Sequence, residues 1–419
     1  MIKITQNMKS DLDSLMKEHD LDAIFVTGPG MHNPAMVYMM GGGHITNADL
    51  IKKRGEEAVL FYEPIERDEA AKSGLKTKSL ADYKHNELID QAGGDVSKAN
   101  VRLYQLIFED LGITSGRVAI YGRTEIGGRY ALLTGLQQAM PGLSFVGEVD
   151  TPVLTLARMT KDNTEIERIR KMGMITTQVV GMVADFITSH AVKAEVMVKK
   201  NGEPLTIREV KSRINLWLAE LGAENPEDTI FSLGHDAGVP HSSGNPADAL
   251  RLGTTIIFDI YPCEAGGGYF YDFTRTWCLG FAPDEVLSLY EQVLATYNKI
   301  VSQLEAGRLF KEYQQMTCEL FSAQGHPTVM EDPQTQAGYV HGLGHGIGLN
   351  VHERPSSWIK GDDANRLVPG AAFTIEPGLY YPEKGMGVRL EDSYTVRQDG
   401  KIDLLASYPL DLVLPVKSS

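Results

Sequence analysis

Carboxylates in apolar, strand-like segments are the first residues of this chain that could do chemistry. Asp259 interrupts Thr254-Thr-Ile-Ile-Phe-Asp-Ile-Tyr, and Asp272 interrupts Tyr269-Phe-Tyr-Asp-Phe-Thr-Arg-Thr-Trp, with a Gly266-Gly-Gly turn between the two segments. A carboxylate is costly to bury unless it is paired, hydrogen-bonded or bound to a metal, and aspartate is a poor strand former. Two of them on opposed strands therefore predict a buried ionic site; the alternative is edge-strand acids that face water.

A second pair of acids has the same arrangement further along the chain. Glu376 ends Ala371-Ala-Phe-Thr-Ile-Glu, and Glu391 lies in Val388-Arg-Leu-Glu-Asp-Ser, with a turn predicted between them. Strand alternation places Arg389 and Glu391 on one face. Two hairpins with one acid per strand predict a duplicated half-site that closes on itself. Four converging carboxylates repel one another, and a pair of divalent cations removes that repulsion.

Histidines supply the other candidate ligands. Between the two hairpins lies Tyr339-Val-His-Gly-Leu-Gly-His-Gly-Ile-Gly-Leu-Asn-Val-His-Glu, which contains His341, His345 and His352. The first two have the spacing of a helical zinc pair, but the interleaved glycines disfavour a helix, and the HExxH pattern is not matched. Glycines here predict close approach of the backbone to a site. His241 lies upstream in Gly-Val-Pro-His-Ser-Ser, and several histidines together with four acids favour a metal site.

Several helices and strands must position these residues. Strands are predicted over 21–27, 57–62 and 117–121, interleaved with helices near 11–19 and 100–111, which indicates an α/β region. A long helix is predicted to start at a capping box of Thr164 and Glu167, and a second at Thr206 and Glu209. A third spans Pro283 to Gly307. The length of 419 residues exceeds the ~250–300 at which one core stops growing, which favours two domains.

Read in order, the four acids and the central histidine resemble the ligand signature of the creatinase/prolidase/methionine aminopeptidase family of metallopeptidases. The motifs that carry the resemblance are Phe-Asp-Ile, Tyr-Asp-Phe-Thr-Arg-Thr, Gly-His-Gly-Ile-Gly-Leu-Asn-Val-His-Glu, Thr-Ile-Glu-Pro-Gly and Val-Arg-Leu-Glu-Asp. They fall within residues 155–415. The segments Leu21-Asp-Ala-Ile-Phe-Val-Thr and Met36-Val-Tyr-Met-Met-Gly-Gly also resemble the N-terminal domain of prolidases. Methionine aminopeptidases usually lack that domain, so the proline-peptidase and creatinase branch is favoured.

The resemblance implies a fold and a ligand set. The fold is α/β (α+β), with a pita-bread metallopeptidase catalytic domain over residues 156–419 and a smaller creatinase/prolidase-type N-terminal domain over residues 1–155. Asp259 and Glu391 would bridge two divalent metal ions, Asp272 would complete one site, and His345 with Glu376 the other. Oxygen-rich ligation favours Mn²⁺, with Co²⁺, Fe²⁺ or Zn²⁺ as further candidates.

The resemblance also implies a reaction. Glu376 would move a proton from a metal-bridging hydroxide to the leaving amine, which is general acid–base catalysis. His352 and His241 would bind the scissile carbonyl, and Arg389 would orient the ligands. The implied enzyme is a metallopeptidase of the Xaa-Pro dipeptidase or aminopeptidase type, which hydrolyses the Xaa-Pro bond at the N-terminus of dipeptides or short peptides. A homodimer is implied as well.

Charge and cysteine content limit the partners and the compartment. The chain has 40 basic and 55 acidic side chains and a net charge of −15, which argues against nucleic acid or an anionic membrane as a partner. The N-terminus lacks the pattern of a secretory signal, and no apolar run is long enough to span a bilayer. Cys263, Cys278 and Cys318 form no CxxC pair. A reducing cytoplasm is therefore predicted.

Two alternatives stay open at this point. The interval from Asp259 to Asp272 is about two residues longer than the family usually shows, and this change beside the substrate pocket leaves room for other chemistry on the same scaffold. Candidates are a metal-dependent dimethylsulfoniopropionate lyase or a creatinase, although creatinases work without metal. The third possibility is a non-catalytic binding module, but such relatives generally lose ligands, and all five are present here.

Overall fold

The computed structural model describes residues 11–416, which form two compact units. The first unit comprises the residues up to Arg158 together with Gly266–Gly268, and the second comprises Met159–Ala265 and the residues from Tyr269 onward. Among the described residues, no helix is both long and apolar enough to cross a bilayer. The assignment of a creatinase/prolidase-type N-terminal domain to residues 1–155 and a catalytic domain to 156–419 stays a prediction.

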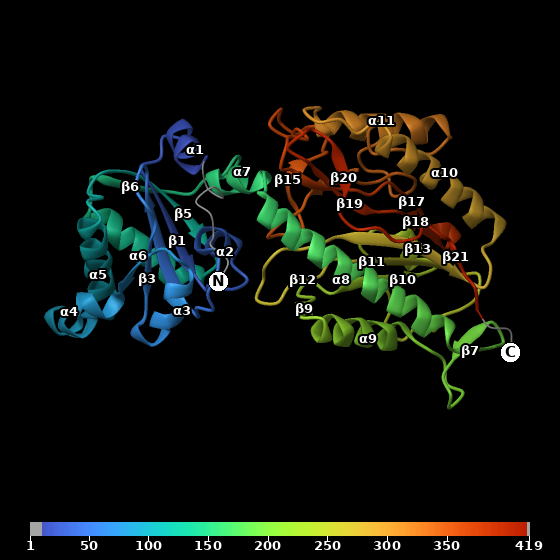
Figure 1. Cartoon of the computed structure of the whole chain (residues 1–419), viewed down its shortest axis with the longest axis horizontal. Coiled ribbons are helices and arrows are strands. Elements are labelled where there is room, and N and C mark those ends of the chain that lie inside the picture. The colour runs from blue at the N-terminus through green and yellow to red at the C-terminus, as the bar shows by residue number, and fades with distance from the viewer. Residues whose placement is uncertain (1–10, 417–419) are drawn as a thin grey trace. The chain divides into compact units, whose positions relative to one another are not determined.

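The first unit is a six-stranded mixed sheet covered by helices, drawn in blue to teal in Figure 1. Its strand order is β4-β3-β2-β1-β5-β6, with β1 parallel to β5 and antiparallel to β2. The strands are β1 Ala23–Gly28, β2 Ala48–Lys53, β3 Val59–Tyr62, β4 Lys76–Ser79, β5 Gly116–Gly122 and β6 Leu143–Val146. The helices are α1 Leu12–Glu18, α2 Pro34–Met40, α3 Arg67–Lys72, α4 His85–Gln91, α5 Val96–Asp110, α6 Ile126–Ala139 and α7 Val153–Met159.

The strands predicted at 21–27, 57–62 and 117–121 correspond to β1, β3 and β5, whereas β2 was not predicted. The reason is its composition, because β2 reads Ala-Asp-Leu-Ile-Lys-Lys and lacks a clean apolar alternation. Lys52 is nevertheless only 8% exposed. Its Nζ donates to Asp13 Oδ1 at 2.6 Å and to the Glu56 carbonyl at 2.7 Å, and these bonds compensate its burial.

The second unit contains the long helices and several small sheets. The sheets have the orders β10-β11-β13-β21 and β15-β14-β16-β19-β20, with β17-β18, β12-β9 and β7-β8 as two-stranded additions. Helix α8 (Asn163–Thr188) packs on α9 (Ile207–Glu220), and α10 (Asp284–Val301) packs on α11 (Phe310–Ala323). Figure 1 shows α10 and α11 along one side of the strands of this unit and α9 along the other. One apolar core joins α10 and α11 to the strands from β16 to β19.

The predicted start of α8 was wrong by about two residues. The capping box consists of Asp162 and Glu165, not Thr164 and Glu167. Glu165 N donates to Asp162 Oδ1 at 2.9 Å, and Asp162 N donates to Glu165 Oε2 at 2.8 Å. Aspartate caps a helix as well as threonine does. The helix therefore begins after Asp162, which has an extended backbone and acts as the N-cap. The capping box of Thr206 and Glu209 at the start of α9 is confirmed.

The first predicted hairpin is present with a shorter second strand. β11 (Thr255–Ile260) pairs antiparallel with β13 (Phe273–Leu279), so that Asp259 faces Thr274 across the ladder. Asp272 comes immediately before β13 rather than within it. Part of the connection between these strands forms β12 (Cys263–Glu264), which pairs with β9 (Ala223–Glu224).

The second predicted hairpin is present, but each arm is divided into two strands. β16 (Ala372–Ile375) pairs with β19 (Asp392–Val396), while β17 (Gly378–Tyr381) pairs with β18 (Met386–Arg389). Pro377 has no N–H to donate to a ladder, which explains the interruption between β16 and β17. Glu376 and Glu391 occupy the two interruptions, where a side chain is not confined to a regular sheet face.

Candidate metal centre

Short irregular segments next to strands position the predicted ligands. Asp259 lies within β11, Asp272 precedes β13, and Glu376 and Glu391 lie at the interruptions of the second hairpin. Asp259, Asp272 and Glu391 are buried, at 8%, 4% and 2% exposure. The β-bridge between Thr274 and Glu391 joins the two hairpins at this point. The structure therefore brings the four acids to one place, as the duplicated half-site predicts.

The glycine-rich segment that supplies His345 has no helix, as predicted. His345 and Gly346 form the short strand β14, which lies between β15 (Glu353–Ser356) and β16. A Cβ atom on Gly344 would lie 2.0 Å from the Thr374 carbonyl oxygen, and one on Gly346 would lie 1.9 Å from the Arg354 carbonyl oxygen. Only glycine permits such a close approach of two backbones. These glycines therefore let His345 reach the acids.

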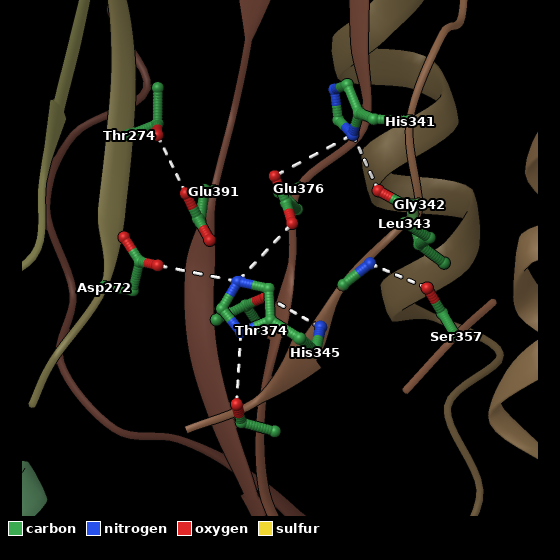
Figure 2. Close-up of polar contacts among 12 residues, drawn as sticks. Asp272, Thr274, His341, Gly342, Leu343, His345, Ser357, Thr374, Glu376 and Glu391 are labelled. Atoms are coloured by element: carbon green, nitrogen blue, oxygen red, sulfur yellow. Dashed lines mark hydrogen bonds and ion pairs between the residues drawn. The ribbon is translucent and has the colours of Figure 1, made fainter. Parts of the chain in front are cut away.

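The central histidine faces two of the carboxylates. His345 Nε2 lies 3.6 Å from Asp272 Oδ2 and 3.6 Å from Glu376 Oε1. Its Nδ1 lies 3.1 Å from the Gly346 carbonyl oxygen, which can only accept, so Nδ1 carries the proton and Nε2 offers a lone pair. One ligand atom each from Asp272, His345 and Glu391 lie within 4.8 Å of one another. Figure 2 shows these side chains and Glu376 directed toward a common point.

Arg389 holds the other predicted ligand, Asp259. Its Nη2 donates to Asp259 Oδ2 at 2.6 Å, and its Nε donates to Thr274 Oγ1 at 3.2 Å. Thr274 Oγ1 in turn donates to Glu391 Oε2 at 2.8 Å. One buried guanidinium thus fixes the carboxylates of Asp259 and Glu391, directly and through a hydroxyl. Thr274 was not predicted, although its i+2 spacing from Asp272 places both side chains on one strand face.

Burial and nearby carboxylates shift the pKa values of Asp272, Glu376 and Glu391 upward in the metal-free chain. Burial raises the pKa of Asp272 well above its ordinary value, and the charges of Asp259 and Glu376 raise it further. The pKa of Glu391 is likewise raised well above its ordinary value by burial and by the neighbouring carboxylates. Burial raises the pKa of Glu376 to about 8, and the positive charge of Arg389 opposes that rise. Burial lowers the pKa of His345 to about 3, so its imidazole is neutral and can act as a ligand.

These shifts predict opposite pH dependences of stability with and without metal. The folded metal-free chain holds its carboxyl protons up to a pKa of about 8 at Glu376, against an ordinary value of 4.5, so between these pH values it binds more protons than the unfolded chain. Loss of these protons lowers its free energy of unfolding as pH rises, and above the ordinary histidine pKa of 6.5 the buried neutral histidines no longer oppose this fall. We expect the melting temperature of chelator-treated protein to fall from pH 6.5 to pH 8, while that of metal-saturated protein does not fall. Thermal melts in chelator and in Mn²⁺ measure both slopes, and parallel slopes would contradict the assignment of these groups to a metal site.

A second buried arginine, Arg275, binds the backbone next to the site. Arg275 is 1% exposed, and all five of its N–H groups have acceptors. Nη1 donates to the Glu391 carbonyl at 2.9 Å, and Nη2 donates to Asp392 Oδ1 at 2.8 Å. Tyr297 donates its hydroxyl hydrogen to the other oxygen of Asp392 at 2.5 Å. This network fixes the backbone that carries Glu391.

Loss of Arg275 is expected to destabilise the protein strongly. An Arg275→Met variant keeps the apolar volume but removes the donor to Asp392 Oδ1, the positive charge beside that carboxylate, and the guanidinium donors to four backbone carbonyl groups. Removing one partner of a buried ion pair costs about 3–5 kcal/mol. Chemical denaturation of the metal-loaded protein measures this loss, and Arg397→Met, at an exposed ion pair with Asp399, is the matched control. A loss of less than about 1 kcal/mol, the range of an exposed pair, would show that the network does not hold this backbone.

A cavity of about 530 Å³ opens over the acids and is lined by every predicted site residue. His241 and His352 are exposed at this cavity, and the ring of His352 lies 4.3 Å from that of His345. Arg389 reaches the cavity from β18. The structure thus brings all eight predicted residues together: Asp259, Asp272, His345, Glu376, Glu391, His241, His352 and Arg389.

His341 and Tyr380 also belong to this site and were not predicted to do so. His341 Nδ1 lies 3.9 Å from Glu376 Oε2 (Figure 2), and its Nε2 lies 2.8 Å from the Tyr380 hydroxyl. Arg389 Nη1 donates to the same hydroxyl at 2.8 Å. The sequence contains a signal for His341, namely its spacing from His345, but this spacing suggests a helical pair, which the interleaved glycines disfavour. Burial lowers the pKa of His341 to about 3, so it is a neutral donor or acceptor beside Glu376.

The residues present fit divalent cations. Within the described part of the chain, Asp259 Oδ1 and Glu391 Oε1 are buried oxygens without a hydrogen-bond partner. A buried carboxylate oxygen without a partner is costly, and a cation supplies the missing interaction. Carboxylates with one neutral imidazole are ligands that suit Mn²⁺ and similar ions. The site therefore has the ligands, the unpaired charge and the open cavity of a catalytic metal centre.

Comparison with known proteins agrees with this interpretation. Residues 167–398 match the model of metallopeptidase family M24. The chain is 27% identical over 399 residues to the Xaa-Pro dipeptidase of Pyrococcus furiosus, covering 94% of this chain and 97% of that one. It is 28% identical to a putative dipeptidase of Bacillus subtilis over 86% of each chain. A solved dipeptidase structure from Pyrococcus horikoshii superposes with a TM-score of 0.73 over 97% of this chain and 99% of that one, at 22% identity.

The fold and the site together define a metal-dependent peptidase. Because the family model matches more than half of the residues, the chain belongs to metallopeptidase family M24. It is an enzyme with the pita-bread fold of that family, as the structural superposition also supports. The predicted family, the predicted fold and the predicted enzyme class are confirmed, and the non-catalytic alternative is not supported.

Proposed function

We propose that this enzyme hydrolyses the Xaa-Pro bond at the N-terminus of dipeptides or short peptides. The observation that carries the proposal is the convergence of four carboxylates and a neutral imidazole under a cavity lined by three further histidines. The name of the relative from Pyrococcus furiosus, an Xaa-Pro dipeptidase, supports this substrate class. A peptide bond to proline has no N–H and a fixed φ, so it needs a site built for it.

The proposed ligand set holds two divalent cations. Asp259 and Glu391 would be ligands that hold them, since both are buried and each has an oxygen without a hydrogen-bond partner among the described residues. Asp272, His345 and Glu376 would supply the remaining ligands, since His345 Nε2 lies 3.6 Å from a carboxylate oxygen of each acid. When bound, such a pair of ions makes a water molecule nucleophilic at neutral pH and stabilises the oxyanion of a tetrahedral intermediate.

Side chains of the protein would transfer the proton and bind the scissile carbonyl group. Glu376 would take the proton from the attacking water and give it to the leaving amine, because it lines the cavity and its carboxylate can accept and release a proton. His352 and His241 line the cavity and would donate hydrogen bonds to the scissile carbonyl. Arg389 would keep Asp259 and Glu391 in place through its bonds to Asp259 and Thr274.

A substrate panel tests the proposal against the other chemistry open to this scaffold. Metal-loaded protein would be offered Xaa-Pro dipeptides, Xaa-Pro tripeptides, matched Xaa-Ala peptides, and small sulfonium and guanidino compounds. We expect release of the first amino acid from Xaa-Pro peptides and slower or no release from Xaa-Ala peptides. Turnover confined to a sulfonium or guanidino compound would instead support the lyase or creatinase alternative.

Three further properties belong to this proposal. We expect Mn²⁺ to be the most effective ion, followed by Co²⁺, Fe²⁺ or Zn²⁺, because the proposed ligands are mainly oxygens. We also expect a homodimer and a cytoplasmic enzyme; its three cysteines are all buried and free. Light scattering of the purified protein measures the oligomeric state.

A further inference from the structure

The mouth of the cavity carries a carboxylate that the proposed reaction does not use. Glu227 lies in the loop between β9 and β10 (Thr229–Leu233), lines the same cavity as His241 and His352, and is exposed. Within the described part of the chain, its carboxylate has no hydrogen bond or ion pair. Of the proposed metal ligands, Asp259, Asp272 and Glu391 are buried and His345 and Glu376 are half-buried, so all five are less exposed than Glu227.

The neighbouring acid, Asp228, differs from Glu227 because its carboxylate has a hydrogen-bond partner. Asp228 also lines the cavity, but its Oδ2 accepts a hydrogen bond from Lys211 Nζ at 2.9 Å. Asp228 has a positive φ of 66°, a conformation that a non-glycine residue adopts at some cost, and the loop is thereby turned at this point. Lys211 neutralises Asp228, and Glu227 keeps a free negative charge at the mouth.

Negatively charged side chains predominate around Glu227 in the lining of the cavity. Among the described residues that line the cavity there is no lysine, and Arg389 is the single arginine. Its guanidinium is buried and bound to Asp259, so it does not offset a charge at the mouth. A group that enters past Glu227 is therefore favoured if it is positively charged.

We infer that Glu227 selects peptides whose first residue has a cationic side chain, lysine or arginine. This inference rests on the proposed Xaa-Pro hydrolysis and names its preferred substrates. The α-ammonium group is only two bonds from the scissile carbonyl carbon, so it must lie deep, near the buried ligands. A lysine ammonium group lies four methylene groups beyond its Cα and can reach the mouth. The reach and the charge of a cationic first side chain thus match the position of Glu227.

The test compares two tripeptides that differ only in that charge, lysyl-prolyl-glycine and norleucyl-prolyl-glycine. We expect the metal-loaded wild-type enzyme to favour the lysyl peptide in kcat/KM by on the order of fivefold, the upper range of an exposed ion pair. Glu227→Gln should remove this preference and leave hydrolysis of the norleucyl peptide unchanged. Added salt should reduce the preference of the wild type. Glu220→Gln, at the exposed end of α9, is the matched control and should keep it.

The outcomes separate the two proposals. If both tripeptides are cleaved equally, or if Glu227→Gln leaves the ratio unchanged, the specificity inference is wrong while the proposed function stands. An equal loss on both peptides would also overturn it, because Glu227 would then act on the shared α-ammonium group. If neither peptide is cleaved, the proposed function fails, and calorimetric binding of the same two peptides still decides whether Glu227 favours the cation.

Discussion

A Glu376→Gln variant is expected to lose at least about 1,000-fold in kcat/KM on an Xaa-Pro tripeptide while it remains folded. Glutamine keeps the size of the side chain but cannot accept a proton from water, and this form of catalysis contributes about 10²- to 10⁴-fold. Glu376 Oε1 is also 3.6 Å from His345 Nε2, so the substitution removes a proposed metal ligand as well. Steady-state kinetics with saturating Mn²⁺ measures the loss.

The control for this variant lies on the same hairpin. Glu383→Gln changes an exposed glutamate in the turn between β17 and β18 and should leave kcat/KM within about twofold of the wild type. Circular dichroism and thermal melts must show that both variants are folded. Wild-type activity in Glu376→Gln would remove this residue from the mechanism, and with it the proposed route of the proton.

Glu391→Gln is expected to abolish metal binding rather than proton transfer. Glu391 is 2% exposed, one oxygen accepts from Thr274, and the other has no partner among the described residues. An amide lacks the charge that a bridging ligand needs, so we expect less than one bound ion per chain and a loss of at least about 1,000-fold in activity. Elemental analysis after dialysis measures the bound metal.

The same substitution should raise the stability of the metal-free protein. Burial and the charges of Asp272, Glu376 and Asp259 all disfavour ionised Glu391. A neutral amide at this position removes the repulsion, so the melting temperature in chelator should be higher for Glu391→Gln than for the wild type at pH 8. A variant that binds two ions, or whose metal-free form is less stable than the wild type, would contradict the role of Glu391 as a bridging ligand.

Much of the candidate site could be predicted because its chemistry restricts residue types. Carboxylates such as Asp259 and Glu391 are rare in buried apolar segments, where they must be paired, hydrogen-bonded or bound to a metal. Strand alternation also predicted that Arg389 and Glu391 share a face, and both line the cavity while Val388 and Leu390 lie in the core. Such arguments work where one local periodicity decides the direction of a side chain.

The remainder depends on contacts between residues far apart in the sequence. Lys52 made β2 look unlike a strand, and its burial is compensated in part by Asp13, which lies 39 positions away in the sequence. Arg275 donates to carbonyl groups more than 100 positions away, so the local sequence does not predict that it fixes the backbone at Glu391. Glu227 lies in an irregular loop without periodicity, and its place at the cavity mouth follows from the fold alone.

The measurement that tests the central claim most directly is a metal titration of the chelated enzyme, with Xaa-Pro hydrolysis and bound Mn²⁺ determined on the same samples. The account predicts no hydrolysis without metal and full activity only when two ions are bound per chain. Activity that persists in metal-free protein, or that saturates with a single bound ion, would contradict a two-ion site built from Asp259, Asp272, His345, Glu376 and Glu391.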